Sequence, residues 1–299
     1  MTGCTPRISV PFSERQGQPA MDKSFWKAII AADYAIPADR TTADLTPELL
    51  EFLGAPDPEL RDDIAYSILA QWIIRGVYTP DDQRALIPQM THNLSNGLGE
   101  RNTNSVFLRS FSTLVLAAIV YRDNHQPFLT EPEVRGVMDQ TLHYFAEEQD
   151  LRGYVPDKGW AHSCAHTADL IDELALHRFL GASDLERLLW AVADKVLAPS
   201  GTILLYDEDE RLSVAVVSAL RRDLLSRSFF ESWLGKLAGF MERTPRHTIF
   251  SDANNHSAYL NTKNLLRSAY LRLSRAEDIP DSVRDIIPLV LATYGKFTF

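Results

Sequence analysis

A short stretch of this sequence, residues 150–173, holds most of the side chains whose types and spacing could do chemistry. Its first half is charged and contains two glycines and a proline, which indicates a loop, and a helix is predicted to follow over 160–180. On such a helix, residues that are four, seven and eleven positions apart lie on one side of the helical wheel. The polar residues with this spacing are His162, His166, Asp169 and Glu173.

Metal binding is one chemistry that this spacing suggests. His162 and His166 have the i,i+4 separation of the histidines in zinc-binding helices, but Ser163 stands where those helices carry the general-base glutamate. Asp169 would lie about 10.5 Å along the helix axis from His162, so a further ligand must come from another segment. The candidate sources are Asp150, Asp157 and the acidic run Asp207-Glu208-Asp209-Glu210.

The leading hypothesis is therefore a small-molecule or metal-dependent site, with a divalent metal as candidate cofactor and hydrolysis as the reaction class. Its catalytic candidates are Asp150, Asp157, His162, His166 and Asp169, and its metal-ligand candidates are His162, His166 and Asp169. The ligand-binding candidates are Arg152, Tyr154, Lys158, Trp160, Glu210 and Arg211.

Purely structural explanations compete with this hypothesis. The polar side of the helix could be a solvated face with i,i+4 pairs, or the two histidines could be buried against backbone carbonyls. The acidic run before Arg211 fits an ordinary helix start. Trp160 is expected in the core rather than on a sugar-binding surface, and Cys164 is expected to be an inert buried thiol.

Two functions of other classes stay open. A non-catalytic helical scaffold would bind a partner protein or peptide in its groove. A helical toroid that acts on a sugar would use Asp150 and Asp157 as acid and base, with Tyr154 or Trp160 stacking on the sugar ring.

Helices must position these residues, and several helix starts are marked in the sequence. Thr46-Pro47, Asp57-Pro58 and Thr79-Pro80 each predict an N-cap followed by proline at the first helical position, and Pro88 is expected to break or kink the helix that begins at Pro80. Only residues 202–206 resemble a strand. Further helices are predicted over 104–122, 131–148, 160–180, 184–197, 208–225, 229–243, 252–274 and 281–294.

These elements predict an all-α fold, a single array of paired antiparallel helices. No strict sequence period is found, which favours a degenerate HEAT-like α-solenoid, with a closed α/α toroid as the alternative. Residues 1–20, rich in Pro, Gly, Ser and Gln, are expected to form a disordered tail, and residues 21–299 a single all-helical domain.

Bulk properties narrow the partners. The formal charge of −10 and the pI near 5.3 would repel phosphate backbones, so a nucleic-acid partner is not expected. The apolar run over residues 111–120 is shorter than the roughly 20 residues of a membrane span, so no membrane association is expected. Two cysteines, Cys4 and Cys164, and the lack of a signal-peptide pattern predict a reducing, cytoplasmic location.

Several short motifs resemble the signature of a bacterial family of uncharacterised proteins, domain of unknown function 2785. The central block consists of Gly153-Tyr154-Val155, the run from Lys158 to His162, and His166 with Ala168-Asp169. Weaker blocks lie at residues 61–66, 109–112 and 210–212, and the resemblance spans residues 40–275. It implies a helical, cytoplasmic bacterial protein that has no agreed activity, and thus leaves the function open.

Overall fold

The computed structural model of this protein describes residues 21–276 and 285–295. The predicted tail over residues 1–20 lies outside the described residues. The elements are α1 (Lys23–Ala31), α2 (Thr42–Phe52), the π-helix η1 (Glu59–Tyr66), α3 (Ser67–Ile74), α4 (Pro80–Asn93), α5 (Ser105–His125), α6 (Glu131–Glu147), β1 (Tyr154–Val155), β2 (Gly159–Trp160), α7 (Ser163–Ala175), α8 (Ala182–Leu197), α9 (Glu208–Arg221), α10 (Arg227–Arg243), α11 (Arg246–Ser251), α12 (Ala253–Leu273) and α14 (Ile286–Gly295).

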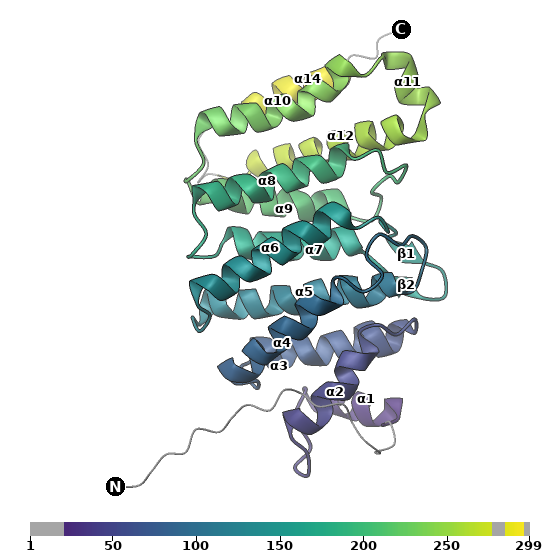
Figure 1. The fold of residues 1–299 in the computed structure, drawn as a ribbon, viewed down its shortest axis with the longest axis vertical. Coiled ribbons are helices and arrows are strands. Elements are labelled where there is room, and N and C mark those ends of the chain that lie inside the picture. Colours follow the sequence, from purple (N-terminus) through teal and green to yellow (C-terminus); the bar gives the residue numbers. More distant parts are fainter. Residues whose placement is uncertain (1–20, 277–284, 296–299) are drawn as a thin grey trace.

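The helices are stacked along the long axis of the molecule, with α1 near one end and α10 and α14 near the other (Figure 1). Helices α5, α7, α9 and α12 contact one another in this order and form one layer, while α4, α6, α8 and α10 form the second layer. The hairpin partners α4–α5, α6–α7 and α8–α9 also contact each other. The all-α prediction is confirmed. Assignment to the HEAT-like class, and to one domain over residues 21–299, stays a prediction.

Local capping signals explain where some helices begin. Thr79 caps α4 and Thr130 caps α6, each in a capping box with the acidic residue three positions later. The predicted start at Thr46-Pro47 is wrong, because Thr41 forms a capping box with Asp44 and α2 begins one turn earlier. Thr46 and Pro47 therefore lie inside α2. Pro88 likewise lies inside α4 and does not end it.

The apolar core runs through the stack, and α5 lies at its centre. This helix is long and apolar enough to cross a membrane by length and composition, but 78% of its most apolar window is buried inside the protein, as in a core helix. Burial of α5 between its neighbours accounts for its nearly continuous apolar sequence.

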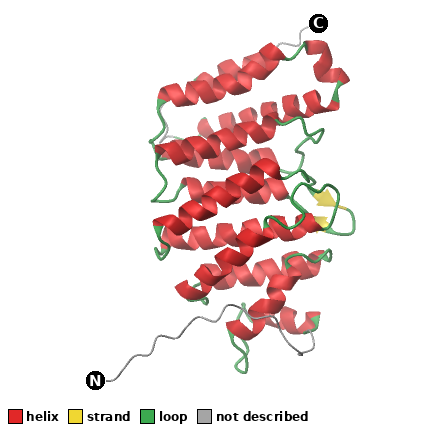
Figure 2. Cartoon of the chain, in the orientation of Figure 1, coloured by secondary structure: helices red, strands yellow, loops and turns green. Residues whose placement is uncertain are grey.

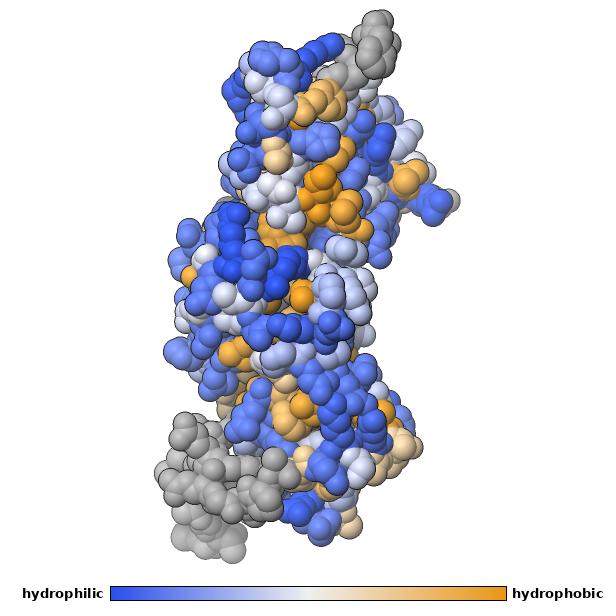
Figure 3. Space-filling view, turned by 90° about the vertical axis from the view of Figure 1, so that its right-hand side faces the viewer, coloured by the Kyte–Doolittle hydropathy of each residue, from blue (hydrophilic) through white to orange (hydrophobic). Residues whose placement is uncertain are grey.

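The surface differs from this core. Figure 3 shows that the face carrying the strands is mainly hydrophilic, with hydrophobic residues exposed between polar ones.

The two short strands are the β-structure in the described part of the chain (Figure 2). They pair antiparallel, with Tyr154 opposite Trp160 and Val155 opposite Gly159. The strand predicted over residues 202–206 is not found; that segment is a loop that leads into α9. A side-chain amide holds this loop, since the Leu204 amide donates to Asn261 Oδ1 at 2.9 Å.

Candidate functional site

A tight hairpin, rather than the first turn of a helix, precedes α7. Asp157 and Gly159 both have positive φ in its turn, 63° and 72°. The ladder continues past the strands, because the amides of Ala161 and His162 donate to the carbonyls of Gly153 and Arg152 at 2.8 and 3.0 Å. The helix predicted from residue 160 therefore begins only at Ser163. Residues 160–162 are extended or left-handed because their amides are used by the hairpin.

A buried arginine from η1 fixes this hairpin. Arg61 is fully buried and donates to the carbonyls of Ala55, Lys158 and Trp160. Its guanidinium also lies 3.9 Å from the centre of the Phe107 ring. Burial lowers the pKa of Arg61 to about 10, which still leaves the side chain charged at neutral pH. The π-helix thus contributes a cation that neutral carbonyls and aromatic rings hold in place.

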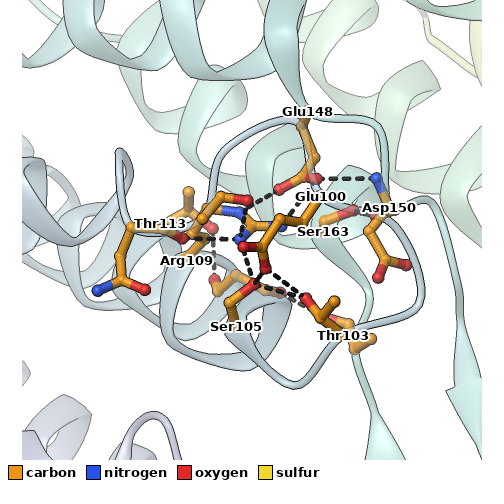
Figure 4. Close-up of polar contacts among 12 residues, drawn as sticks. Glu100, Thr103, Ser105, Arg109, Thr113, Glu148, Asp150 and Ser163 are labelled. Atoms are coloured by element: carbon orange, nitrogen blue, oxygen red, sulfur yellow. Dashed lines mark hydrogen bonds and ion pairs between the residues drawn. The ribbon is translucent and has the colours of Figure 1, made fainter.

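A second buried network holds the chain just before the hairpin (Figure 4). Arg109 forms a two-bond ion pair with Glu148, at 2.6 and 3.0 Å, and both side chains are buried. Arg109 also donates to the carbonyls of Asn96 and Gly97 at 2.8 and 2.9 Å. The Glu148 carboxylate accepts from the Asp150 amide at 2.8 Å, which links α5 to the segment that leads into the hairpin.

Several predicted site residues belong to this scaffold and do not line a cavity. Asp150 is buried and accepts from the Asn102 amide at 2.9 Å and from Arg152 at 2.6 Å. Asp157 is exposed in the hairpin turn, and Lys158 donates to Asn104 at 2.9 Å. Of two more candidates, Tyr154 is half exposed beside the Trp160 ring, whereas Glu210 pairs with Arg272 at 2.7 Å and lines a separate cavity of about 360 Å³.

Other predicted site residues meet at one cavity of about 570 Å³, which we call the central cavity. It lies where η1, α5, the hairpin, α7 and the start of α9 converge. Of the predicted site residues, Trp160, His162, His166, Asp169 and Arg211 line it. The remaining lining residues are Asp62, Tyr66, Leu114, Leu205, Tyr206 and Asp207.

Asp62, Tyr66 and Tyr206 line the central cavity although the sequence does not mark them as site residues, and Asp207 lines it from the acidic run that the sequence offers as a source of carboxylates. Asp62 and Tyr66 lie within η1, and π-helical segments are frequent at functional sites because they displace side chains from the α-helical register. In the sequence, Asp62 and Tyr66 belong to a block, residues 61–66, that carries only the family resemblance.

His162 occupies an unusual position at the N-terminal end of α7. Its backbone is left-handed, with φ 49° and ψ 34°, and its side chain is only 7% exposed. The Trp160 ring stacks on the imidazole with centroids 4.2 Å apart, so Trp160 is a partly exposed wall of the cavity rather than a core residue. Nε2 of His162 is buried and has no hydrogen-bond partner among the described residues.

Burial keeps His162 neutral. It lowers the pKa of the imidazole to about 4, and the nearby Arg211 charge adds to this effect, while Asp207 and the Tyr206 backbone act in the opposite direction. At neutral pH the ring therefore carries one proton and one lone pair. The cavity presents an uncharged imidazole there, not a cation.

His166 lies one turn further along α7, with its ring 5.6 Å from that of His162. Its Nδ1 is 2.8 Å from the hydroxyl oxygen of Ser110, and that hydroxyl donates to the Ala161 carbonyl. Burial lowers the pKa of His166 well below its ordinary value, and the neighbouring His162 and Arg211 lower it further. This second imidazole is neutral as well.

Asp169 and Arg211 form an ion pair across the cavity wall, from α7 to α9. Burial nevertheless raises the pKa of Asp169 to about 6, because the attraction to Arg211 only partly offsets the loss of solvent. Burial also raises the pKa of Asp62, and raises that of the Tyr66 hydroxyl to about 12. Asp169 is therefore the group of the wall placed to exchange a proton near neutral pH.

The Tyr206 ring packs directly against Gly153 in this wall. A Cβ atom at Gly153 would lie 2.0 Å from a carbon of that ring, so only glycine lets the tyrosine pack on the hairpin. The Tyr206 ring in turn lies edge-on to Trp160 at 5.6 Å. The glycine of the central motif therefore has a structural reason, which is to admit an aromatic residue 53 positions later in the chain (206 − 153 = 53).

The metal-binding hypothesis has weak geometric support. Within residues 21–276 and 285–295, no group of three or more His, Cys, Asp or Glu side chains is arranged to hold a metal ion. Of the three predicted ligands His162, His166 and Asp169, the aspartate is already paired with Arg211. Cys164 is buried as predicted, and burial raises the pKa of its thiol to about 12, which makes it a poor nucleophile.

Comparison with known proteins identifies a family but no function. Residues 94–271 match the family model described as "Protein of unknown function (DUF2785)", which confirms the resemblance. The matched part includes the hairpin, α7 and the start of α9, whereas Asp62 and Tyr66 precede it. Comparison with curated proteins and with solved structures gives no match.

Proposed function

This chain belongs to the family of proteins of unknown function DUF2785, and we propose that it binds a small polar molecule in the central cavity. The cavity volume, about 570 Å³, is in the range of known small-molecule pockets. Its lining mixes aromatic walls with carboxylates, imidazoles and one guanidinium. This composition favours a polar ligand over an apolar one.

The observation that carries the proposal is the unpartnered Nε2 of His162. Buried polar atoms in native proteins are hydrogen-bonded in the great majority of cases, and leaving one unpaired costs about 1–3 kcal/mol. His162 faces this cost at a cavity wall, in a left-handed backbone conformation that is itself uncommon outside glycine. A ligand that bonds to Nε2 would offset the cost, and such local sacrifices of stability are typical of binding sites.

A thermal-shift screen of small polar metabolites and divalent metals tests the proposal. At least one compound should stabilise the wild type, by about 2.7 kcal/mol at one hundred times its dissociation constant. His162→Phe, which keeps the stack on Trp160 but removes the ring nitrogens, should lose this stabilisation. His162→Asn, which tolerates the left-handed backbone, should lose it as well.

The same variants distinguish a binding residue from a structural one. Without ligand, His162→Phe should stay close to the wild type in stability, because it removes an unpaired buried nitrogen and keeps the ring stacked on Trp160. His143→Ala, at an exposed histidine on α6, should keep both the stability and the ligand response. A screen without any shift for the wild type, together with a large loss of stability in both His162 variants, would contradict the proposal.

A further inference from the structure

The hydrogen-bonding capacity and the charge of the central cavity indicate the chemical class of its ligand. Resting on the proposed function, we propose that the ligand is an organic cation whose ammonium or guanidinium group donates hydrogen bonds to the two imidazoles and to the carboxylates of the wall. The inference rests on the proton positions of the two histidines, the unpartnered nitrogen of one of them, and the balance of charges around the cavity.

The hydrogen-bond chain behind His166 determines where its proton lies. The Ser110 hydroxyl has one proton, and the Ala161 carbonyl can only accept, so that proton points to Ala161. Ser110 must then accept from His166 Nδ1, 2.8 Å away. A neutral imidazole with its proton on Nδ1 has a lone pair on Nε2, which makes no hydrogen bond within the described residues. His166 is therefore a hydrogen-bond acceptor toward the cavity that it lines.

His162 is the second neutral ring of the wall. A neutral imidazole carries one proton and one lone pair. Its Nε2 is buried and has no hydrogen-bond partner among the described residues, so this proposal places the lone pair of His162 on Nε2. The cavity wall holds two neutral acceptors, and their rings are 5.6 Å apart.

Charge reinforces this preference for donors. The lining carries the carboxylates of Asp62, Asp169 and Asp207 and the single cation Arg211, so with neutral histidines its formal charge is −3 + 1 = −2. Arg211 is already paired with Asp169. Arg61, which lies behind the hairpin, donates its hydrogen bonds to backbone carbonyls, although its charge also acts on Asp62 and His166.

These features exclude other ligand classes by their own chemistry. An anion would face two lone pairs and two carboxylates that have no cationic partner in the lining, and Arg211, the cation of the lining, is already paired with Asp169. A neutral polyol could donate hydrogen bonds, but it would leave the charge of −2 unbalanced. An organic cation satisfies both requirements, and the rings of Trp160 and Tyr206 offer an apolar wall to its carbon skeleton.

The test compares matched molecules that differ in charge. Isothermal titration calorimetry on the full chain near neutral pH would use butane-1,4-diamine, butane-1,4-diol and butanedioate, then glucosamine, glucose and glucuronate, with agmatine as a guanidinium probe. At least one cation should bind about tenfold or more tightly than its neutral counterpart, and the anions should not bind. Asp62→Asn should weaken cation binding about tenfold, whereas Asp139→Asn, at an exposed carboxylate on α6, should not change it.

The outcomes separate this inference from the proposed function. If a neutral or anionic member of a series binds as tightly as the cation, the cation inference is wrong and small-molecule binding stands. If Zn²⁺ binds with one ion per chain and His162→Phe abolishes it, the two imidazoles form a metal site and the cation inference is again wrong. If no probe binds but the wider metabolite screen finds a ligand that is not a cation, only the inference fails; if that screen is empty too, both fail.

Discussion

Single residues of the central cavity are held in states that their types alone would not suggest. His162 and His166 are neutral because both rings are buried, and Asp169 keeps a raised pKa although an arginine is its partner. Burial dominates each of these shifts, since a buried side chain loses solvation that a single neighbour only partly replaces. Burial of these polar groups therefore costs some stability, and this cost can be measured.

Replacing Asp169 should reveal that cost. Its pKa of about 6 lies above the ordinary 3.8, so the folded state binds the proton more tightly than the unfolded state does. The contribution of Asp169 to stability should therefore fall as the pH rises from about 4 to 6, and the full penalty should persist above that range. Asp169→Asn should be more stable than the wild type at neutral pH by about 1 kcal/mol, allowing for a side chain that is 33% exposed.

Urea denaturation at several pH values measures this difference. The advantage of Asp169→Asn should shrink toward zero as the pH falls to about 4, because both proteins are then uncharged at this position. Asp139→Asn, on the exposed face of α6, should show no such trend. If Asp169→Asn is less stable than the wild type at neutral pH, then the ion pair with Arg211 outweighs the loss of solvation.

The hairpin and the loop before α9 form the part of the central-cavity wall that depends most on close packing. Gly153 meets the Tyr206 ring, and Gly159 takes a positive φ beside Pro58. The ion pair between Arg109 on α5 and Glu148 fixes the segment that enters the hairpin (Figure 4). Glycines and one buried ion pair thus position a wall that has little regular structure of its own.

Gly153→Ala should disturb this wall. The added methyl group would lie 2.0 Å from the Tyr206 ring, so the ring must move, at a cost of about 1–3 kcal/mol as in other overpacked sites. Ligand-induced stabilisation should fall as well, because Tyr206 lines the cavity. Gly136→Ala is the matched control, since nothing lies within 4 Å of its added methyl inside α6. It should gain about 0.5–1 kcal/mol by improving helix propensity.

The buried ion pair should behave differently from a surface pair. Glu148→Ala leaves Arg109 charged and buried, which should cost about 3–5 kcal/mol in urea denaturation. Asp139→Ala removes an exposed pair with Arg187 and should cost less than about 1 kcal/mol. The double change Arg109→Met with Glu148→Leu should lower the free energy of unfolding much less than Glu148→Ala does, since neither charge is then left unpaired. An equal loss would show that packing, not charge, is the cause.

At the scale of the whole molecule, stacking in sequence order determines the shape. Neighbouring helix pairs contact one another, while α1 and α14 lie at opposite ends of the long axis (Figure 1). In such an array each pair buries its apolar face against the next, so the core is long rather than round. The central cavity lies part-way along this core, where η1, α5, the hairpin, α7 and the start of α9 meet.

Small-angle X-ray scattering should detect this shape. A compact chain of 299 residues would have a radius of gyration of about 19 Å. We expect a larger value and an asymmetric distribution of interatomic distances. A variant that begins at Met21 controls for the contribution of residues 1–20. A value near 19 Å for that variant would favour the closed toroid that the sequence also allowed.

The sequence by itself determined those features whose signals are local. The helical class, the capped starts of α4 and α6, the buried thiol of Cys164 and the placing of His166 and Asp169 on one helix all follow from residue types within a few turns of each other. Helix periodicity and capping depend on neighbours three or four positions away, which a single sequence contains in full. Arg211 follows an acidic helix start and lines the cavity, and its role in ligand binding stays a prediction.

Only the tertiary structure decided which polar residues face the cavity. Arg61 donates to the Lys158 carbonyl, 97 positions away, and so holds the hairpin where a first helical turn was predicted. Asp150 accepts from the Asn102 amide in the loop before α5 and from Arg152, and becomes part of the scaffold. Asp62 and Tyr66 reach the cavity from a π-helix that precedes α7 by nearly 100 residues. Burial and pairing between segments so far apart depend on how helices pack, and no local pattern encodes that.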